Sequence, residues 1–374
     1  MLRHLIIDKF RGFEHLELHG LGRVNLLVGT NNSGKTSVLE AIQLLLSYGH
    51  LGSIYSTLFR RGEQLLGESE RRPQPEADVC RLFHDYGLEP GNIFTITGTN
   101  NRSVKKLSAT ISEAPPPQLG TSPGALRQSS LFENESEYVK PYWLVLRWGE
   151  ADIIEEALPL SPRGGLPMPD VRRPSRPNGG GQSIRFIPTA SLSVDEIVAL
   201  FEESVLTPEE DLVIEALRTI EPTIERIASV GIDRPYYRSY LGGRGGIVVK
   251  CVGVQQRIPI GSMGDGMWRM LGLALALVHA KGGVVLVDEI DTGLHFTVMA
   301  DMWRLVAQTA ARFDVQVFAT THSSDCSSSL AAVAHKFDSG DEVTIQRIER
   351  GKQRAVAFTG QEIVIAASRD IEVR

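Results

Sequence analysis

A phosphate-binding loop pattern near the start of the chain constrains the fold more than any other feature of this sequence. Gly29-Thr30-Asn31-Asn32-Ser33-Gly34-Lys35-Thr36 matches the eight-residue P-loop pattern. The apolar run Arg23 to Val28 before it predicts a buried strand, and Ser37 to Leu46 after it predicts an amphipathic helix. In this setting, backbone N–H groups, the helix N-terminus and the Lys35 ammonium face phosphates. The predicted nucleoside triphosphate ligands are Asn31, Asn32, Ser33, Gly34, Lys35, Thr36 and Ser37.

A second motif far downstream completes the predicted nucleotide site. The run from Gly283 is apolar until it ends in the carboxylates Asp288 and Glu289. Such a strand is typical of a parallel sheet covered on both faces, and ligands bind at the carboxyl edge of such sheets. We therefore predict that Asp288 and the Thr36 hydroxyl hold Mg²⁺, and that Glu289 polarises the attacking water. Because the two motifs lie so far apart, a subdomain must be inserted between them.

The segment before the acidic strand predicts a second anion site. Small residues from Gly261 to Gly266 lead directly into an apolar helix predicted over Met267 to Leu277. Small residues at a helix N-terminus leave its backbone N–H groups open to an anion. One subunit does not need two such sites. We therefore expect Ser262 and Gly264 to contact the γ-phosphate of a nucleotide bound by a partner subunit.

The segments after the acidic strand predict a loop and a histidine close to the nucleotide. Asp291 to His295 reads as a loop, and Val315 to Thr321 reads as another buried strand that ends at His322. A lone histidine is usually structural or merely exposed. At the carboxyl edge of a strand beside the acidic one, however, it lies where ligands bind. We therefore expect His322 to act in catalysis together with Glu289 and Lys35.

Together these segments resemble the ABC-type ATPase head of the SMC/RecF group, and most closely its OLD (overcoming lysogenization defect)-like branch. Four motifs carry the resemblance. The degenerate signature is Ser262-Met263-Gly264, and the VDE-type Walker B is Val287-Asp288-Glu289. The D-loop is Asp291-Thr292-Gly293-Leu294-His295, and the switch is Thr320-Thr321-His322-Ser323. The resemblance implies ATP and Mg²⁺ as cofactors and D-loop roles for Asp291 and His295. It also implies a homodimer that closes around ATP as a sandwich.

The resemblance extends to the start of the chain, with departures elsewhere. The Phe-Arg-Gly-Phe sequence around Arg11 looks like the F-R-x-F start of these heads, which implies that Arg11 approaches the nucleotide phosphates. In the D-loop, Asp291 stands where glutamate is commoner, and Phe296 replaces the usual proline. No glutamine is assigned to the Q-loop, because Gln64 is a weak candidate and Gln43 lies inside the P-loop helix.

Composition indicates a globular enzyme of one to two domains. Hydrophobic residues make up 42% and charged residues 22% of the 374 positions, which is ordinary for a globular protein. No apolar run approaches the ~18 residues needed to span a bilayer, and no apolar leader opens the chain. Three widely spaced cysteines without metal-type spacing indicate free thiols in a reducing compartment. These features predict a cytoplasmic protein without a membrane partner.

The remaining segments predict an α/β fold in which an ABC-type head is interrupted by a mixed, partly helical insertion. The head combines an antiparallel β lobe with a mostly parallel core sheet and flanking helices. Residues 1–110 form its N-terminal part, 111–240 the insertion, and 241–374 its C-terminal part. Further strands are predicted at 2–7, 16–18, 93–98, 104–111, 142–148, 247–252, 256–260, 342–350 and 354–359, and helices at 193–202, 208–229 and near the C-terminus.

One irregular stretch, Pro159 to Gly181, concentrates arginines among prolines and glycines. Its arginines are Arg163, Arg172, Arg173 and Arg176. Two interpretations stay open, because the stretch reads either as a surface loop or as an arm that contacts DNA phosphates. A formal net charge of −6 gives no global support for DNA binding. We therefore expect DNA binding to be weak.

These features leave three classes of function. The first is a nucleotide-gated ATPase that recruits a separately encoded effector, such as a nuclease, as in anti-phage defence systems built on this family. The second is a DNA-repair or chromosome-maintenance ATPase that clamps DNA, as RecF-type proteins do. The third, a transporter subunit, is disfavoured because such subunits carry a fuller LSGGQ signature and a clear Q-loop. We expect no TOPRIM nuclease domain, because the few residues after His322 hold no acidic cluster. The effector-gating ATPase is therefore favoured.

Overall fold

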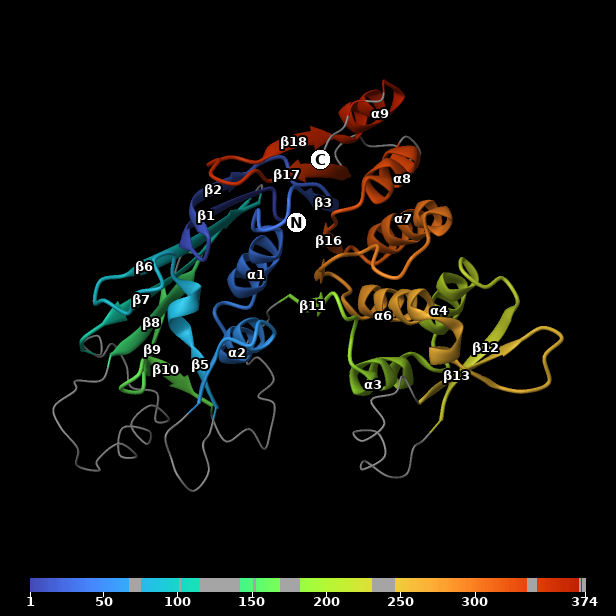
Figure 1. Cartoon of the computed structure of the whole chain (residues 1–374), viewed down its shortest axis with the longest axis horizontal. Coiled ribbons are helices and arrows are strands. Elements are labelled where there is room, and N and C mark those ends of the chain that lie inside the picture. The colour runs from blue at the N-terminus through green and yellow to red at the C-terminus, as the bar shows by residue number, and fades with distance from the viewer. Residues whose placement is uncertain are drawn as a thin grey trace. The chain divides into compact units, whose positions relative to one another are not determined.

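The computed structural model describes residues 1–66, 75–100, 102–114, 142–150, 153–168, 182–230, 246–334, 342–369 and 371 (Figure 1). The chain forms two compact units. The first, here called the core unit, consists of Met1–Leu2, Leu18–Leu39 and Gln182–Arg374. The second, here called the lobe unit, consists of Arg3–Glu17 and Glu40–Gly181.

A six-stranded, mostly parallel sheet forms the centre of the core unit. Its strand order is β11 (Ile184–Ile187), β15 (Val284–Val287), β16 (Gln316–Thr320), β3 (Val24–Val28), β17 (Val343–Arg347) and β18 (Val356–Thr359). Neighbouring strands are parallel except for the β17–β18 pair, which is antiparallel. Every residue of β3, β15 and β16 is buried, as expected for apolar strands covered on both faces. The predicted parallel core sheet is therefore confirmed.

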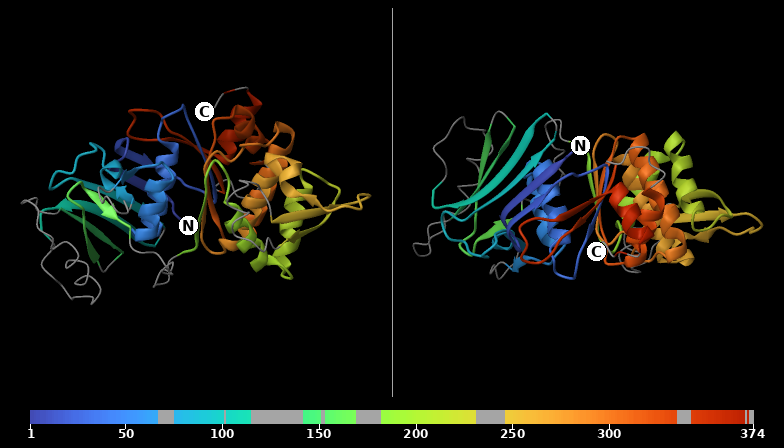
Figure 2. Two further views of the ribbon diagram at one scale, coloured as in Figure 1. Left: turned by 60° about the horizontal axis from the view of Figure 1, so that its bottom comes forward. Right: turned by 90° about the horizontal axis from the view of Figure 1, so that it is seen from above.

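Helices cover this sheet. Helices α6 (Asp265–His279), α7 (Phe296–Arg312) and α8 (Ser324–Ala334) lie side by side against it, and α9 (Gly360–Ser368) packs on α8 (Figures 1 and 2). Helix α6 is buried from Met267 to Val278, because α3 (Val194–Ser204), α4 (Pro208–Arg218) and α7 all contact it. A three-stranded sheet of β12 (Ile224–Ser229), β13 (Ile247–Cys251) and β14 (Ile258–Pro259) packs beside α3 and α4.

The lobe unit is built around a second six-stranded sheet. Its order is β2 (Phe13–Leu18), β1 (His4–Phe10), β6 (Ile93–Thr99), β7 (Val104–Ser112), β8 (Trp143–Gly149) and β9 (Ile154–Pro159). The pairs β1–β6, β6–β7, β7–β8 and β8–β9 are all antiparallel. The predicted hairpin of β6 and β7 is confirmed. Phe94 packs edge-on against Phe10 and Phe83, with ring centroids 5.2 Å apart in both pairs, in the core of this unit.

The described part of the lobe unit also contains a small sheet and helix α2. Strands β10 (Gly165–Pro167), β5 (Pro75–Asp78) and β4 (Gln64–Leu66) form a three-stranded sheet. Helix α2 (Leu51–Phe59) contacts β5, and the 3₁₀ turn η1 (Val79–Leu82) follows β5. Because β10 lies within the stretch Pro159 to Gly181, the prediction of a continuous loop there is wrong for its described part. Arg172, Arg173 and Arg176 lie outside the described residues.

One further prediction of local structure is wrong, and one strand of the core sheet was not predicted. A helix was predicted over residues 208–229, but helix α4 ends at Arg218. Residues 224–229, at the end of the predicted range, form strand β12 instead. Pro222 lies between the two elements, and a proline cannot continue a helix because it lacks the N–H donor. Strand β11 was not expected, since it has only four residues and follows an irregular stretch. It belongs to the core sheet, so the compact units do not share the bounds of the three predicted segments.

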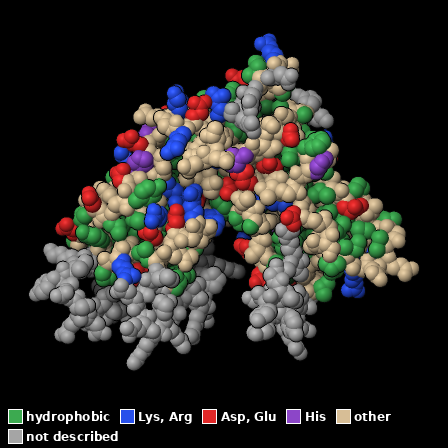
Figure 3. Space-filling view, viewed as in Figure 1, with side chains coloured by type: hydrophobic (Ala, Val, Ile, Leu, Met, Phe, Trp, Pro, Cys, Tyr) green, Lys and Arg blue, Asp and Glu red, His purple; other side chains and the backbone are tan. Residues whose placement is uncertain are grey.

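The surface and the cysteines agree with a globular protein. Figure 3 shows Lys and Arg side chains interspersed with Asp and Glu side chains on the face that it presents. Cys80, Cys251 and Cys326 are free thiols. In the part of the chain that the structure describes, no helix is both long enough and apolar enough to cross a bilayer.

Candidate functional site

The predicted phosphate-binding loop lies at the carboxyl end of β3 and leads into helix α1 (Lys35–Leu46). Gly29 has a φ of +143°, and a Cβ there would lie 2.2 Å from the carbonyl oxygen of Ile348, so no other residue fits. Asn32 also has a positive φ, of +60°. These conformations turn the loop back over the start of α1. Of the predicted ligands, Asn31 and Asn32 are exposed, Ser33, Lys35 and Ser37 are buried, and Gly34 and Thr36 are intermediate.

Lys35 points back into the loop that precedes it. Its Nζ atom donates hydrogen bonds to the carbonyl oxygens of Gly29, at 2.8 Å, and Thr30, at 3.0 Å. It also lies 3.2 Å from Nδ1 of His322, which follows β16. Burial lowers the pKa of Lys35, although the nearby carboxylates of Glu289 and Asp288 oppose that effect. The lysine charge is therefore held inside the loop, beside the histidine that the sequence predicted.

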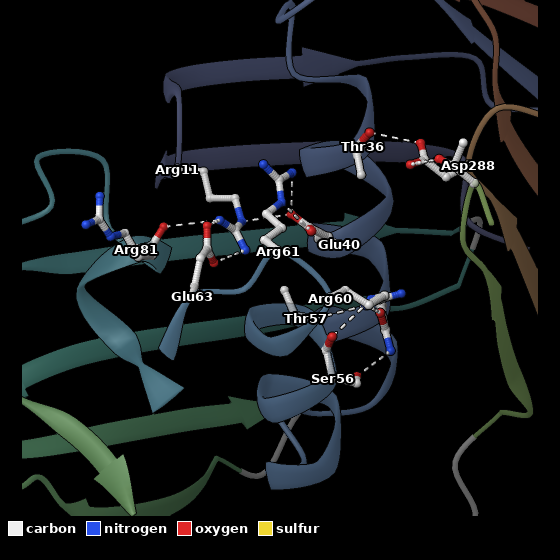
Figure 4. A network of polar contacts seen from close by, with 12 residues as sticks. Arg11, Thr36, Glu40, Ser56, Thr57, Arg60, Arg61, Glu63, Arg81 and Asp288 are labelled. Atoms are coloured by element: carbon white, nitrogen blue, oxygen red, sulfur yellow. Dashed lines mark hydrogen bonds and ion pairs between the residues drawn. The ribbon is translucent and has the colours of Figure 1, made fainter. Parts of the chain in front are cut away.

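Asp288 lies at the carboxyl end of β15 and accepts three hydroxyl hydrogen bonds. The Oγ1 atoms of Thr36 and Thr320 both donate to its Oδ1, at 2.9 Å each (Thr36 and Asp288 are shown in Figure 4). The Oγ1 of Thr189, from the loop after β11, donates to its Oδ2 at 3.0 Å. The predicted Thr36–Asp288 pair is thus brought together. Thr320 belongs to the predicted switch motif, whereas Thr189, which follows the carboxyl end of β11, was not predicted as a neighbour of the site.

Glu289 occupies an unusual backbone conformation next to His322. Its φ is +51°, and its N–H donates to Oγ1 of Thr320 at 2.8 Å. Its Oε1 lies 3.0 Å from Nε2 of His322. Burial, followed by the charges of Asp288 and Asp291, raises the pKa of Glu289 to about 7. A carboxyl that titrates near neutral pH is suited to proton transfer.

His322 is held between a cation and an acid. Burial, followed by the charge of Lys35, lowers the pKa of His322 from its ordinary value. The ring is therefore neutral at pH 7. Because Lys35 can only donate, Nδ1 of His322 accepts, and Nε2 carries the proton that faces Glu289. The three residues form a continuous polar chain from the P-loop to the acidic strand.

The D-loop residues lie in different surroundings. Oγ1 of Thr321 donates to Oδ1 of Asp291 at 2.6 Å, which ties the D-loop to the end of β16. His295 is exposed at the start of α7, where its Nδ1 lies 2.9 Å from Oγ1 of Thr297 and its ring packs on Phe296. Asp291 therefore belongs to the charged cluster around Glu289, whereas His295 faces outward.

The predicted signature residues precede helix α6. Ser262 lies in a 3₁₀ turn over Ile260–Met263, and Gly264, with a φ of +95°, immediately precedes α6. Both residues are exposed. Ser262 and Gly264 are therefore accessible to a second molecule. The predicted contact with a partner's nucleotide requires this accessibility.

Arg11 lies in the lobe unit and is held by carboxylates. Its side chain is 5% exposed, and its guanidinium forms ion pairs at 2.8 Å with both Glu40 and Glu63 (Figure 4). Arg61 also pairs with Glu40, at 2.8 Å. Arg11 thus has a structural role within its unit, and its approach to nucleotide phosphates stays a prediction.

One buried arginine beside the site was not predicted. Arg269 lies on α6, is 2% exposed, and donates to the backbone carbonyl oxygens of Asp288 and Glu289. Burial lowers the pKa of Arg269 to about 10, although the neighbouring carboxylates of Asp288, Asp291 and Glu289 favour its charge. The signal was present in the sequence, because a single arginine interrupts an apolar helix. A charge at that position needs buried partners.

Comparison with known proteins gives the family of this chain. Residues 24–325 match the family described as "AAA domain, putative AbiEii toxin, Type IV TA system". An ATP/GTP phosphatase of Helicobacter pylori is 21% identical over 96% of this chain and 95% of its own length. A DNA replication and repair protein RecF of Nitrosococcus oceani is 35% identical, over 30% of each chain.

Among solved structures, an SMC head bound to the C-winged helix domain of ScpA is similar. Its TM-score is 0.46 at 14% identity, covering 96% of this chain and 98% of that chain. The family match itself spans more than half of the sequence and includes both the P-loop and the acidic strand. The chain therefore belongs to this family of AAA domains and is a P-loop ATPase.

Proposed function

We propose that this protein binds ATP at the P-loop and hydrolyses it with Glu289, His322 and Lys35. The observation that carries the proposal is the polar chain from Lys35 through His322 to Glu289, with contacts of 3.2 and 3.0 Å. Lys35 offers its charge to the β- and γ-phosphates. Glu289 accepts a proton from the attacking water, and His322 orients that carboxylate and lies beside the transferring phosphoryl group.

Mg²⁺ fits the residues at the start of α1 and the end of β15. Oγ1 of Thr36 and Oδ1 of Asp288 are 2.9 Å apart, and both are hard oxygen donors. In phosphoryl-transfer enzymes, Mg²⁺ is commonly held by one or two protein groups together with water and substrate phosphates. Bound there, the ion would neutralise charge on the phosphates. Thr320 and Thr189 orient the Asp288 carboxylate through their own hydrogen bonds.

The same proposal includes a homodimer closed around two nucleotides. Ser262 and Gly264 are exposed at the start of α6, where backbone N–H groups offer a site for an anion. We infer that they meet the γ-phosphate held by Lys35 of a second subunit. Each nucleotide would then be enclosed only in the dimer, so ATP binding itself drives association.

We infer that the closed dimer gates a separately encoded effector in anti-phage defence, as an OLD-like ATPase. Two observations support this reading. The description of the family names an AbiEii toxin and a type IV TA system. The motifs Ser262-Met263-Gly264 and Thr320-Thr321-His322-Ser323 resemble those of the OLD-like branch.

A second candidate is a DNA-clamping ATPase of the RecF kind. The observation that favours it is the local similarity to RecF, which covers 30% of this chain. The two candidates share nucleotide binding and dimerisation and differ in what the closed dimer contacts. Stimulation of ATP turnover by duplex DNA would favour the clamp.

The test compares the wild-type protein with Glu289→Gln and Lys35→Ala in light scattering and turnover assays. ATP should convert Glu289→Gln into a stable dimer, transiently dimerise the wild type, and leave Lys35→Ala unchanged. Cells that express this chain together with the genes that flank its own gene should resist phage only when the ATPase is wild type. A wild type that neither hydrolyses ATP nor associates with it would contradict the proposal.

A further inference from the structure

Arg269 is a deeply buried charge beside the site, and its hydrogen bonds within the described residues go to backbone carbonyls. Nη1 donates to the carbonyl oxygen of Pro188 at 2.5 Å. Nη2 donates to the carbonyl oxygens of Asp288, at 2.5 Å, and Glu289, at 2.8 Å. An arginine that served only to offset the nearby carboxylates would bind their side chains. This one instead holds the main chain from which they project.

The main chain at Glu289 needs such support. Its φ of +51° lies in the left-handed region, which residues other than glycine and asparagine rarely adopt. Conformations of this kind persist only where the surroundings hold them. The Glu289 N–H donates to Thr320, and the Glu289 carbonyl oxygen accepts from Arg269 at 2.8 Å and from the Thr292 N–H at 3.1 Å. The direction of the Glu289 side chain therefore depends on these contacts.

Arg269 also joins the ends of two neighbouring strands. Pro188 follows β11, and the next residue, Thr189, donates to Oδ2 of Asp288. By binding Pro188 and Asp288 together, the planar guanidinium holds the loop after β11 against the end of β15. A point-like ammonium could not span these carbonyls with the same geometry.

The start of the same helix is in backbone contact with the D-loop. A Cβ on Gly266 would lie 2.6 Å from the carbonyl oxygen of Gly293, and one on Gly293 would lie 3.1 Å from Cβ of Asp265. The two segments therefore pack without space for a side chain. Helix α6 thus carries the exposed Ser262–Gly264 segment at its start, the D-loop against its first turn, and Arg269 one turn further along.

We propose that Arg269 is a positioning residue through which helix α6 sets the orientation of Glu289. A movement at the start of α6 would shift the Glu289 backbone, because the Arg269 side chain connects the helix to that backbone. The inference rests on the proposed function in assigning the water-activating role to Glu289. The mechanical link between Arg269 and residues 288–291 stands on the contacts alone and can be measured without turnover.

The test uses Arg269→Met, which keeps an unbranched apolar stem but removes the guanidinium and its donors, and Arg269→Lys, which restores the charge and a single ammonium group in place of the planar guanidinium. The matched control is Arg23→Met, since Arg23 lies in the same unit but contacts Ala310 and Asp314. Steady-state turnover and binding of a non-hydrolysable ATP analogue are measured for each. Hydrogen exchange is followed in peptides covering residues 187–190 and 288–291, whose amides are hydrogen-bonded at Asp288, Glu289 and Ile290.

We expect Arg269→Met to lower kcat about 100-fold, the cost of misplacing a catalytic group by about 1 Å, with analogue affinity within about threefold of wild type. Exchange should rise at residues 288–291 and stay unchanged in the P-loop. Arg269→Lys should fall between Arg269→Met and wild type, and Arg23→Met should match wild type. Unchanged exchange at residues 288–291 in a folded Arg269 variant would overturn the inference.

The outcomes separate this inference from the proposed function. If the wild type does not hydrolyse ATP, the proposed function fails, while the exchange measurement still decides on the mechanical link. If Arg269→Met does not fold, the turnover and hydrogen exchange of Arg269→Lys test the inference. A folded Arg269→Lys with wild-type turnover and exchange would show that the orientation of Glu289 does not depend on the guanidinium.

Discussion

The imidazole of His322 bridges Lys35 and Glu289, with its Nδ1 3.2 Å from the Lys35 Nζ and its Nε2 3.0 Å from the Glu289 Oε1. A neutral ring fits this position because it offers one acceptor and one donor. The P-loop at the end of β3 and the acidic residue at the end of β15 are therefore linked through the strand between them. A substitution at Lys35 should therefore alter the surroundings of Glu289, and a substitution at Glu289 those of Lys35.

Replacing Lys35 with alanine should weaken ATP binding. The substitution removes the cation that is held within the P-loop, and a hydrogen bond to a charged group contributes about 1.5–3 kcal/mol, or roughly 10- to 100-fold in affinity. Isothermal titration calorimetry measures this directly. Lys250→Ala, which removes an exposed lysine paired with Glu225, serves as the control and should bind as the wild type does. Equal affinity for Lys35→Ala and wild type would rule out the P-loop assignment.

Replacing Glu289 with glutamine should separate binding from hydrolysis. The amide cannot accept a proton from water, so kcat should fall by about 10²- to 10⁴-fold. Thr36 and Asp288 are untouched, so ATP affinity in the presence of Mg²⁺ should stay within about threefold of wild type. Glu225→Gln, on β12, is the matched control. Near-normal turnover by Glu289→Gln would assign the base to another residue.

The kcat/KM for ATP should depend on pH near neutrality. Burial raises the pKa of Glu289 to about 7, and the carboxylate form is the base. Lowering the pH through 7 protonates this base, so kcat/KM should fall, approaching about tenfold per pH unit well below the pKa. Burial and the charge of Lys35 lower the pKa of His322 from its ordinary value, so His322 titrates at lower pH than Glu289. Binding of a non-hydrolysable analogue over the same range provides the control, and a flat profile from pH 6 to 8 would refute the prediction.

Two inactive variants should complement each other. Ser262→Arg blocks the exposed segment before α6 but leaves Lys35 intact, so it should bind ATP without hydrolysing it. A mixed dimer with Lys35→Ala contains one complete composite site. At equal amounts, half of the dimers are mixed, so turnover should recover to about a quarter of the wild-type value. Inactive mixtures, in which mixed dimers are shown to form, would count against the sandwich.

DNA binding should be weak and only mildly sensitive to salt. The four arginines from Arg163 to Arg176 could neutralise a few phosphates, so the log–log slope of affinity against salt should be no steeper than about −4. Alanine at Arg172, Arg173 and Arg176 together should reduce the residual binding without changing ATP turnover. Fluorescence anisotropy with labelled duplex measures both quantities. A slope much steeper than this would require a larger basic surface.

The core of the site could be predicted because its parts are local motifs. The P-loop needs one strand, one turn and one helix start, all contiguous in sequence. The acidic strand and the His322 strand were each recognisable as buried apolar runs that end in polar residues. Their convergence followed from the rule that parallel strands share a carboxyl edge, and the pairing of β15 with β16 and of β16 with β3 confirms it.

The parts that were missed depend on long-range packing. Strand β11 is too short to give a periodic signal, so Thr189 could not be placed beside Asp288. The role of Arg269 depends on three carbonyls from two loops that are distant in sequence. Arg11 was read from its motif alone, and its pairing with Glu40 and Glu63 arises from tertiary packing that no local pattern encodes.

The place of β3 in its sheet has a consequence for synthesis of the chain. This strand carries the P-loop and is made early, yet both of its neighbours, β16 and β17, come from the last sixth of the sequence. Until residues 316–347 have left the ribosome, β3 has two unpaired edges, and exposed apolar edges favour aggregation. Nucleotide binding is thus a property of the nearly complete chain, and products of interrupted translation should be insoluble and unable to bind ATP.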